Sequence, residues 1–186
     1  MKTKLTLVAF ATSILIVSNG VSASSAKNDI YTSDNQFDRI SVKWVEPKTF
    51  SDVREANYST AKSRERVFNQ LEKHLDKLAE DLPEGQTINF TFTNVDLAGR
   101  VEPASFIGLS NSISDVRVMR DVDIPRIKFE YELVDTNGAV IRAEEVNLKN
   151  MNYLREIRLS SRNSPYEHEK QMLSEWFSKN IIEDRA

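Results

Sequence analysis

The sequence contains no cysteine and few residues that break regular structure, with five glycines and five prolines among 186 residues. A chain without thiols forms no disulfide and cannot carry a lipid on a cysteine at its processing site. Burial of apolar side chains must therefore hold the fold together. Hydrophobic residues make up 40% of the chain and charged residues 28%, which is the balance of a soluble globular protein.

Sequence motifs of the common enzyme classes are also missing. There is no Gly-x-Ser-x-Gly nucleophile elbow, no His-Glu-x-x-His motif, no phosphate-binding loop and no dinucleotide fingerprint. The two histidines, His74 and His168, lie in predicted helices away from any serine motif, which disfavours a Ser-His arrangement. We therefore expect no cofactor, and the sequence favours a protein that is not an enzyme.

The N-terminal end has the three parts of a secretory signal peptide. Residues 1–4 include two lysines, residues 5–17 form a mostly apolar run, and Val21, Ser22 and Ala23 fit a small-residue cleavage site. The apolar run falls short of the ~20 residues that a spanning helix needs. We therefore predict export, cleavage after Ala23, a periplasmic location and no membrane span in the mature form.

The charge balance argues against two classes of partner. Removal of residues 1–23 takes away two lysines and no acidic residue, so the mature chain has 23 basic and 28 acidic side chains and a net charge of −5. A chain of this charge has no general attraction to nucleic acid or to an anionic membrane surface. The partners that remain are an envelope protein or a small ligand, and we expect a soluble monomer.

One α+β domain accounts for most of the mature chain. We predict a flexible lead-in over residues 24–39, the domain over residues 40–182 and a tail over residues 183–186. The expected fold is a mostly antiparallel sheet of about four to five strands, with two helices packed on one face. The expected order of elements is β-α-β-β-β-α.

A β-hairpin is the strongest local signal. Residues 127–133 alternate apolar and charged side chains, an Asn-Gly pair supplies the turn, and residues 140–148 form the return strand. The apolar residues of the return strand change parity part-way along it. We therefore predict a β-bulge near Glu144 and Glu145.

Other elements follow from the same kinds of pattern. Residues 40–44 and 87–93 alternate as strands. Residues 63–82 carry apolar side chains at helical spacing, with charged residues on the opposite side. Residues 116–119 suggest a short edge strand. Each expected helix therefore has one apolar side to bury against the sheet.

The last helix carries its own start signal. Ser164 can cap it, Pro165 suits its first turn, and Glu167 completes a Ser-x-x-Glu capping box. The residues expected on its apolar face are Tyr166, Leu173, Trp176, Phe177 and Ile181.

Several sequence blocks resemble one protein family. In chain order they are VKWVEPKTFSDVR, NVDLAGRVEP, RVMRDVDIPRIKFEYELVDTNGAVI and EKQMLSEWF, and the resemblance runs from Ile40 to Ile181. They resemble an exported proteobacterial family known as domain of unknown function 3016. The resemblance implies no reaction, ligand or partner. The family more often has an acidic residue where this chain has Asn94 and Asn150, which weakens any role for a carboxylate at either position.

The first functional hypothesis is a soluble binding or structural module of the bacterial envelope. Residues 99–123 are the expected binding region, because a connection of this length in a compact domain is usually functional or disordered. The candidate binding residues are Phe106, Ile107, Leu109, Arg117 and Arg120.

The alternative is a periplasmic hydrolase that uses carboxylates. Its candidate catalytic residues are Asp96, Asp121 and Asp123, because paired carboxylates can serve as acid and base when their surroundings separate their pKa values. The Asp-x-Asp pair lacks the number of ligands that a Ca²⁺ loop offers. We therefore predict no metal site, and we interpret the arginines nearby as surface ion-pair partners.

Export can be tested on the mature protein. If the signal peptide is removed as predicted, protein recovered from the periplasm should begin at Ser24. Intact-mass measurement after expression of the full coding sequence distinguishes this start from the uncut chain. A soluble species that retains residues 1–23 would contradict the prediction.

Overall fold

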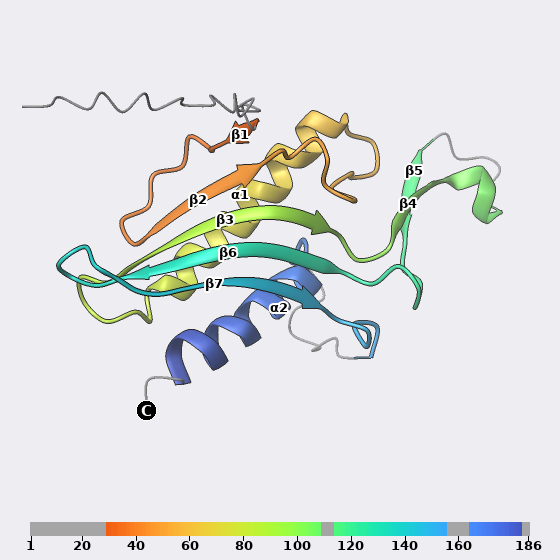
Figure 1. Ribbon diagram of the computed structural model, residues 1–186. Coiled ribbons are helices and arrows are strands. Elements are labelled where there is room, and N and C mark those ends of the chain that lie inside the picture. The colour runs from red at the N-terminus through yellow and green to blue at the C-terminus, as the bar shows by residue number, and fades with distance from the viewer. Residues whose placement is uncertain (1–28, 109–113, 156–163, 184–186) are drawn as a thin grey trace, which may run out of the picture.

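The computed structural model describes residues 29–108, 114–155 and 164–183. Their elements are β1 (Ile30–Tyr31), β2 (Ile40–Val45), α1 (Thr60–Ala79), β3 (Thr87–Asp96), β4 (Arg100–Pro103), the 3-10 turn η1 (Ala104–Ile107), β5 (Asp115–Val118), β6 (Arg126–Val134), β7 (Val140–Lys149), α2 (Glu167–Phe177) and the π-helical turn η2 (Ser178–Ile182). A five-stranded sheet has the order β1-β2-β3-β6-β7, and β4 and β5 form a separate two-stranded sheet. Figure 1 shows this arrangement, with α1 and α2 on one side of the large sheet.

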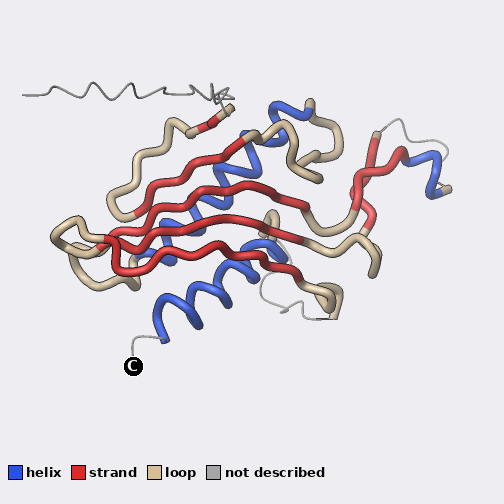
Figure 2. Tube along the Cα trace, viewed as in Figure 1, coloured by secondary structure: helices blue, strands red, loops and turns tan. Residues whose placement is uncertain are grey.

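The predicted α+β class is confirmed, with a mostly antiparallel sheet and two helices. Only the β2–β3 pair is parallel among the described strands, and α1 makes the crossover between these two strands. β3, β6 and β7 then pair antiparallel in sequence order. Figure 2 shows these strands as one continuous twisted layer, with the small β4–β5 sheet projecting beyond its end.

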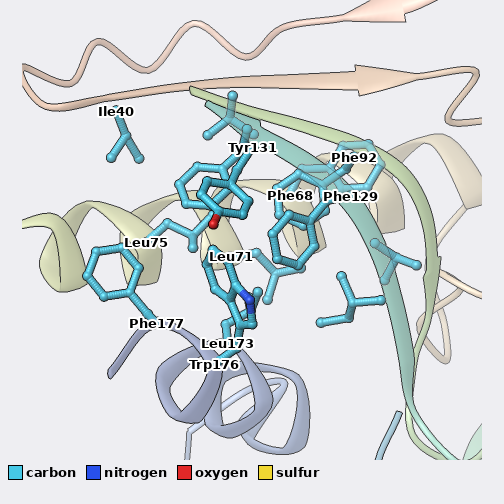
Figure 3. Close-up of a cluster of buried hydrophobic side chains, with 14 of the residues drawn as sticks. Ile40, Phe68, Leu71, Leu75, Phe92, Phe129, Tyr131, Leu173, Trp176 and Phe177 are labelled. Atoms are coloured by element: carbon cyan, nitrogen blue, oxygen red, sulfur yellow. The ribbon is translucent and has the colours of Figure 1, made fainter. Parts of the chain in front are cut away.

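The hydrophobic core lies between the large sheet and the two helices. On β3 and β6 every second residue is buried, as the alternation in sequence predicts. In the close-up of Figure 3, Trp176 of α2 points toward Phe129 and Tyr131 of the sheet. The ring centroids of Trp176 lie 4.8 Å from Phe129 and 5.0 Å from Tyr131, both in edge-to-face contact.

A buried carboxylate ties α1 to the sheet. Glu72 is fully buried, and its Oε1 accepts a hydrogen bond of 2.8 Å from Nε1 of Trp44 on β2. Its Oε2 accepts from Asn35 Nδ2 at 2.6 Å and from the Ser33 hydroxyl. These contacts satisfy a group that would otherwise be costly to bury. They also fasten part of the segment that was expected to be a flexible lead-in, and that segment contributes β1 as well.

Several details of the elements differ from the sequence prediction. β3 continues beyond residue 93 to Asp96, after a register shift between Phe92 and Asn94. α1 begins at Thr60, because the Ser59 hydroxyl accepts the N–H of Lys62 as an N-cap. The hairpin bulge lies at Ile141, next to the turn, and not near Glu144 and Glu145. The exposed Ile141 can occupy a bulge without loss of core contacts.

The predicted capping box at the start of α2 is wrong. The residue before the helix is Tyr166, which has a left-handed backbone (φ 59°, ψ 39°) and no side-chain cap. The Ser164 hydroxyl instead accepts from Lys170 Nζ at 3.3 Å, so it does not reach the first N–H groups of the helix. Four of the five residues predicted on the apolar face, Leu173, Trp176, Phe177 and Ile181, are buried. The fifth, Tyr166, is half-buried and precedes the helix.

The expected edge strand at residues 116–119 belongs to the small sheet. β5 pairs with β4 and has no partner in the large sheet among the described residues. Gly99 (φ 74°) connects β3 to β4 and lies against β5. Only glycine fits there, because a Cβ would lie 2.5 Å from the carbonyl oxygen of Val118. The predicted signal peptide (residues 1–23), Leu109 and residues 184–186 lie outside the described residues.

The burial of Trp176 leads to a stability prediction. Only 7% of this residue is exposed, so Trp176→Ala leaves a cavity among aromatic rings and should cost ~3–5 kcal/mol of unfolding free energy. The matched control is Met151→Ala, at a residue that is 70% exposed. Urea unfolding measures both variants. An unchanged midpoint for Trp176→Ala would place this side chain outside the core.

Candidate functional site

A largely apolar pocket of about 480 Å³ lies where four segments meet. These segments are the residues that follow β3, the loop that precedes α1, the end of β5 and the start of α2. The residues that line the pocket are Glu55, Ala56, Tyr58, Leu97, Ala98, Arg117, Met119, Ser164, Tyr166, Glu167, His168 and Glu169. The size and the mixture of apolar walls with a few charged groups are typical of small-molecule sites.

Glu169 is the buried charge-bearing group of this pocket. Only 2% of the residue is exposed, and its Oε1 accepts a hydrogen bond of 2.6 Å from the backbone N–H of Ala98. Burial raises the pKa of the Glu169 carboxyl, while this hydrogen bond and the nearby Arg117 guanidinium oppose the rise. The position in the first turn of α2 also favours a negative charge. Glu169 can therefore hold or release a proton at the pocket wall.

Tyr166 and Glu55 form the opposite wall. The Tyr166 hydroxyl donates to Glu55 Oε1, and Glu55 Oε2 accepts from Arg66 Nε at 2.8 Å. Burial is the main cause that raises the pKa of the Tyr166 hydroxyl, and the hydrogen bond to Glu55 raises it further. The hydroxyl therefore remains a proton donor. The Arg66 guanidinium also lies 4.7 Å from the centre of the Tyr58 ring. These contacts fix the two aromatic rings that line the pocket.

Strained backbone gathers at this pocket. Three described residues other than glycine have a positive φ, and two of them flank the pocket, namely Asn57 (φ 67°) and Tyr166 (φ 59°). A left-handed conformation costs of order 1–3 kcal/mol for a residue such as tyrosine, and such residues cluster at functional sites. At Tyr166 the cost is offset by its contact with Glu55. The strain therefore marks the pocket as a candidate site.

Arg117 holds the pocket together from the small sheet. Its Nη1 donates to the carbonyl oxygens of Ala98 (3.0 Å) and Gly99 (2.9 Å). Its Nη2 donates to Asp52 Oδ2 at 3.1 Å and to the carbonyl oxygen of Arg54. Arg117 was predicted as a binding residue, and it does line the pocket. Since both terminal nitrogens are engaged within the protein, its evident role is to position the walls.

His168 adds a neutral imidazole to the pocket. Burial lowers the pKa of its ring, which also makes an edge-to-face contact with Tyr153 at 4.8 Å. The other histidine, His74, lies between the two helices, where Nε2 is 2.8 Å from the Ser174 hydroxyl and 3.0 Å from the Lys170 carbonyl oxygen. Burial lowers the pKa of His74 as well. His74 is therefore a contact between helices and not part of the pocket.

A second, polar pocket of about 540 Å³ brings together two of the predicted catalytic aspartates. Asp96 and Asp123 both line it, beside Asp52. Asp96 Oδ2 lies 2.8 Å from Arg126 Nη1, and burial raises the pKa of Asp96 against the effect of this ion pair. Asp123 lies 3.6–3.7 Å from the guanidinium groups of two arginines. Each of these carboxylates thus has an arginine within ion-pair distance.

The remaining candidates lie apart from both pockets. Asp121 and Arg120 are exposed, and Arg120 pairs with Glu102 at 3.1 Å. Phe106 and Ile107 lie in η1 at the end of the small sheet, with exposed fractions of 79% and 38%. Leu109 lies outside the described residues. Among the described residues, no group of three or more His, Asp or Glu side chains is arranged to hold a metal ion.

Sequence reasoning missed the most buried polar member of the pocket. Glu169 precedes Leu173 and Trp176 at helical spacing, so the pattern places a carboxylate on the apolar face of α2. A carboxylate on the apolar face of a helix indicates a residue that is functional or strongly hydrogen-bonded. No comparable signal pointed to Glu55, because its contact with Tyr166 joins residues 111 positions apart.

Comparison with known protein families identifies the family of this chain. A family described as "Protein of unknown function (DUF3016)" matches residues 38–179. This chain belongs to that family. The segment shared with the DUF3016 family includes every residue that lines the apolar pocket. No curated protein and no solved structure matches the chain. No helix in the described part of the chain is long and apolar enough to cross a membrane.

The raised pKa of Glu169 predicts a pH dependence of stability. The folded protein holds this proton to higher pH than the unfolded chain, so unfolding free energy falls as pH rises from 4.5, the ordinary value, through the raised pKa. Glu169→Gln keeps an oxygen for the Ala98 N–H and removes the titration. The stability of this variant relative to the native protein should therefore rise with pH across that window and then level off.

Urea unfolding from about pH 4 to pH 8 measures this difference. The control is Glu175→Gln, at an exposed position of α2, which should follow the native protein. Parallel curves for the native protein and Glu169→Gln would show that burial does not shift the titration of Glu169.

Proposed function

We propose that this chain is an exported binding module of the bacterial envelope. Its site is the apolar pocket, and its ligand is a small molecule with an apolar body and a positively charged end. The proposal of export rests on the order of basic, apolar and small residues in residues 1–23. The proposal of binding rests on the pocket and on the charges at its wall.

The proposed ligand class follows from which charged side chains at the pocket already have an ion-pair partner. Both arginines at the site are already paired, Arg117 with Asp52 and Arg66 with Glu55. In the described part of the chain, neither Glu167 nor Glu169 forms an ion pair. A ligand ammonium group would therefore find carboxylate acceptors and little competing positive charge. The walls formed by Leu97, Met119 and the tyrosine rings would contact its apolar body.

The hydrolase alternative has weaker support. Of its three candidates, Asp121 is exposed and lies outside the polar pocket. Asp96 and Asp123 share that pocket, but each has an arginine within ion-pair distance. Burial raises the pKa of Asp96, as a general acid requires, but its carboxylate is already paired with Arg126. We therefore favour binding over hydrolysis.

Phenethylamine tests the ligand class, because it combines one ring with one ammonium group. We expect saturable binding in a calorimetric titration, and much weaker binding of the uncharged phenethyl alcohol and the anionic hydrocinnamate. Affinity for the amine should rise as pH increases through the pKa of Glu169, because the cation prefers the ionised carboxylate. Equal binding of all three probes would contradict a role for charge.

Single substitutions test whether the amine binds in the apolar pocket. Glu169→Gln should weaken amine binding by roughly tenfold or more, the effect of losing a charge-assisted hydrogen bond. Ala56→Phe should fill the pocket and abolish binding of all three probes. Glu175→Gln lies on the exposed side of α2 and should leave the affinity unchanged. Amine binding that survives both Glu169→Gln and Ala56→Phe would place the site elsewhere.

A further inference from the structure

We propose that the edge strand β7 is an interaction surface for a second copy of this chain. The two copies would pair antiparallel along β7 and join their sheets into one. The sequence led us to expect a monomer, so this inference departs from that expectation. It is independent of the ligand pocket, which lies at the start of α2 and the end of β3.

The two edges of the large sheet differ in length. β1, at one edge, has two residues, whereas β7, at the other, has ten. β7 pairs with β6 along one side, and no described strand pairs with its other side. A long edge strand presents a row of backbone donors and acceptors that can pair with another strand. Figure 1 shows β7 along the outer margin of the sheet.

Backbone parity identifies the groups that point outward. The N–H of Asn150 donates to the carbonyl oxygen of Pro125 on the β6 side at 3.3 Å. Because hydrogen-bonding direction alternates along an antiparallel strand, the even-numbered residues of this part of β7 face β6. The N–H and C=O groups of the odd-numbered residues therefore point away from the sheet. These residues are Ala143, Glu145, Asn147 and Lys149, all with exposed side chains.

Charge favours one register for the pairing of two copies in the second half of β7, which the bulge at Ile141 leaves regular. With a two-fold axis at Asn147, Glu145 of each copy lies directly opposite Lys149 of the other. A two-fold axis at Glu145 would place two glutamates opposite each other, and an axis at Val146 would pair no opposite charges. Opposite charges stabilise and like charges destabilise directly facing positions. Lys149 forms no ion pair within the described residues, so it is available to Glu145 of the second copy.

The same register also matches apolar side chains on the other face. It places Val146 of one copy opposite Leu148 of the other, and both side chains are half-buried in the single chain. Leu148 borders a groove between β7 and α2 that is also lined by Met172 and Trp176. The bulge at Ile141 limits regular pairing to the second half of the strand. The surface is therefore self-complementary, as a two-fold interface requires.

Sedimentation equilibrium of the mature protein, purified after expression and export of the full coding sequence, tests this pairing. We expect the average mass to rise with concentration toward twice the mass of one chain. Glu145→Lys places lysine opposite Lys149, and Lys149→Glu places glutamate opposite Glu145. Each single variant should lower the association constant by roughly tenfold or more. A mixture of the two variants should associate, since every facing pair is then of opposite charge.

Two controls separate the interface from other effects. Glu65→Lys makes the same charge change on α1, at an exposed position away from β7, and should leave association unchanged. Circular dichroism and thermal unfolding check that Glu145→Lys is folded, because Glu145 also contacts Lys128 within one chain (2.6 Å). A native protein that stays monomeric at all concentrations overturns the proposal. So does a dimer that neither charge variant weakens, which would place the interface elsewhere.

Discussion

The hydrogen bond between the Ala98 N–H and the Glu169 carboxylate is the contact on which the site depends. It joins the end of β3 to the first turn of α2, and the apolar pocket lies beside it. A buried carboxylate without such a donor would be expensive, so the position of the helix is constrained by the strand end. The bond therefore sets the width of the pocket and holds a titratable group in its wall.

Buried glutamates join both helices to the sheet in this cysteine-free protein. Glu72 of α1 accepts from Trp44, Asn35 and Ser33, and Glu169 of α2 accepts from Ala98. The surroundings of the two differ. Several side-chain donors surround Glu72 inside the core, whereas Glu169 lines a pocket. The same residue type thus fastens α1 to the core and places a carboxyl group of α2 in the wall of the pocket.

The projecting small sheet contributes to the site through its base. We predicted function for residues 99–123, and from that segment Arg117 and Met119 reach the apolar pocket. Phe106 and Ile107, at the far end of the small sheet, do not line it. Arg117 holds the strand end in place through the carbonyl oxygens of Ala98 and Gly99. The remaining walls come from Leu97, Ala98 and residues 55–58 and 164–169, to which the sequence assigned no functional role.

Periodic patterns in the sequence determined the fold class, the hairpin, the two helices and their apolar faces. These features depend on side chains a few positions apart, and local periodicity reports them directly. Only the tertiary structure decided where α2 begins, because the conformation of Tyr166 is coupled to Glu55, 111 positions away. It also decided the pairing of Asp96 with Arg126 and the contact of Glu169 with Ala98. Such contacts follow from how whole elements pack, and no local pattern in a single sequence records that geometry.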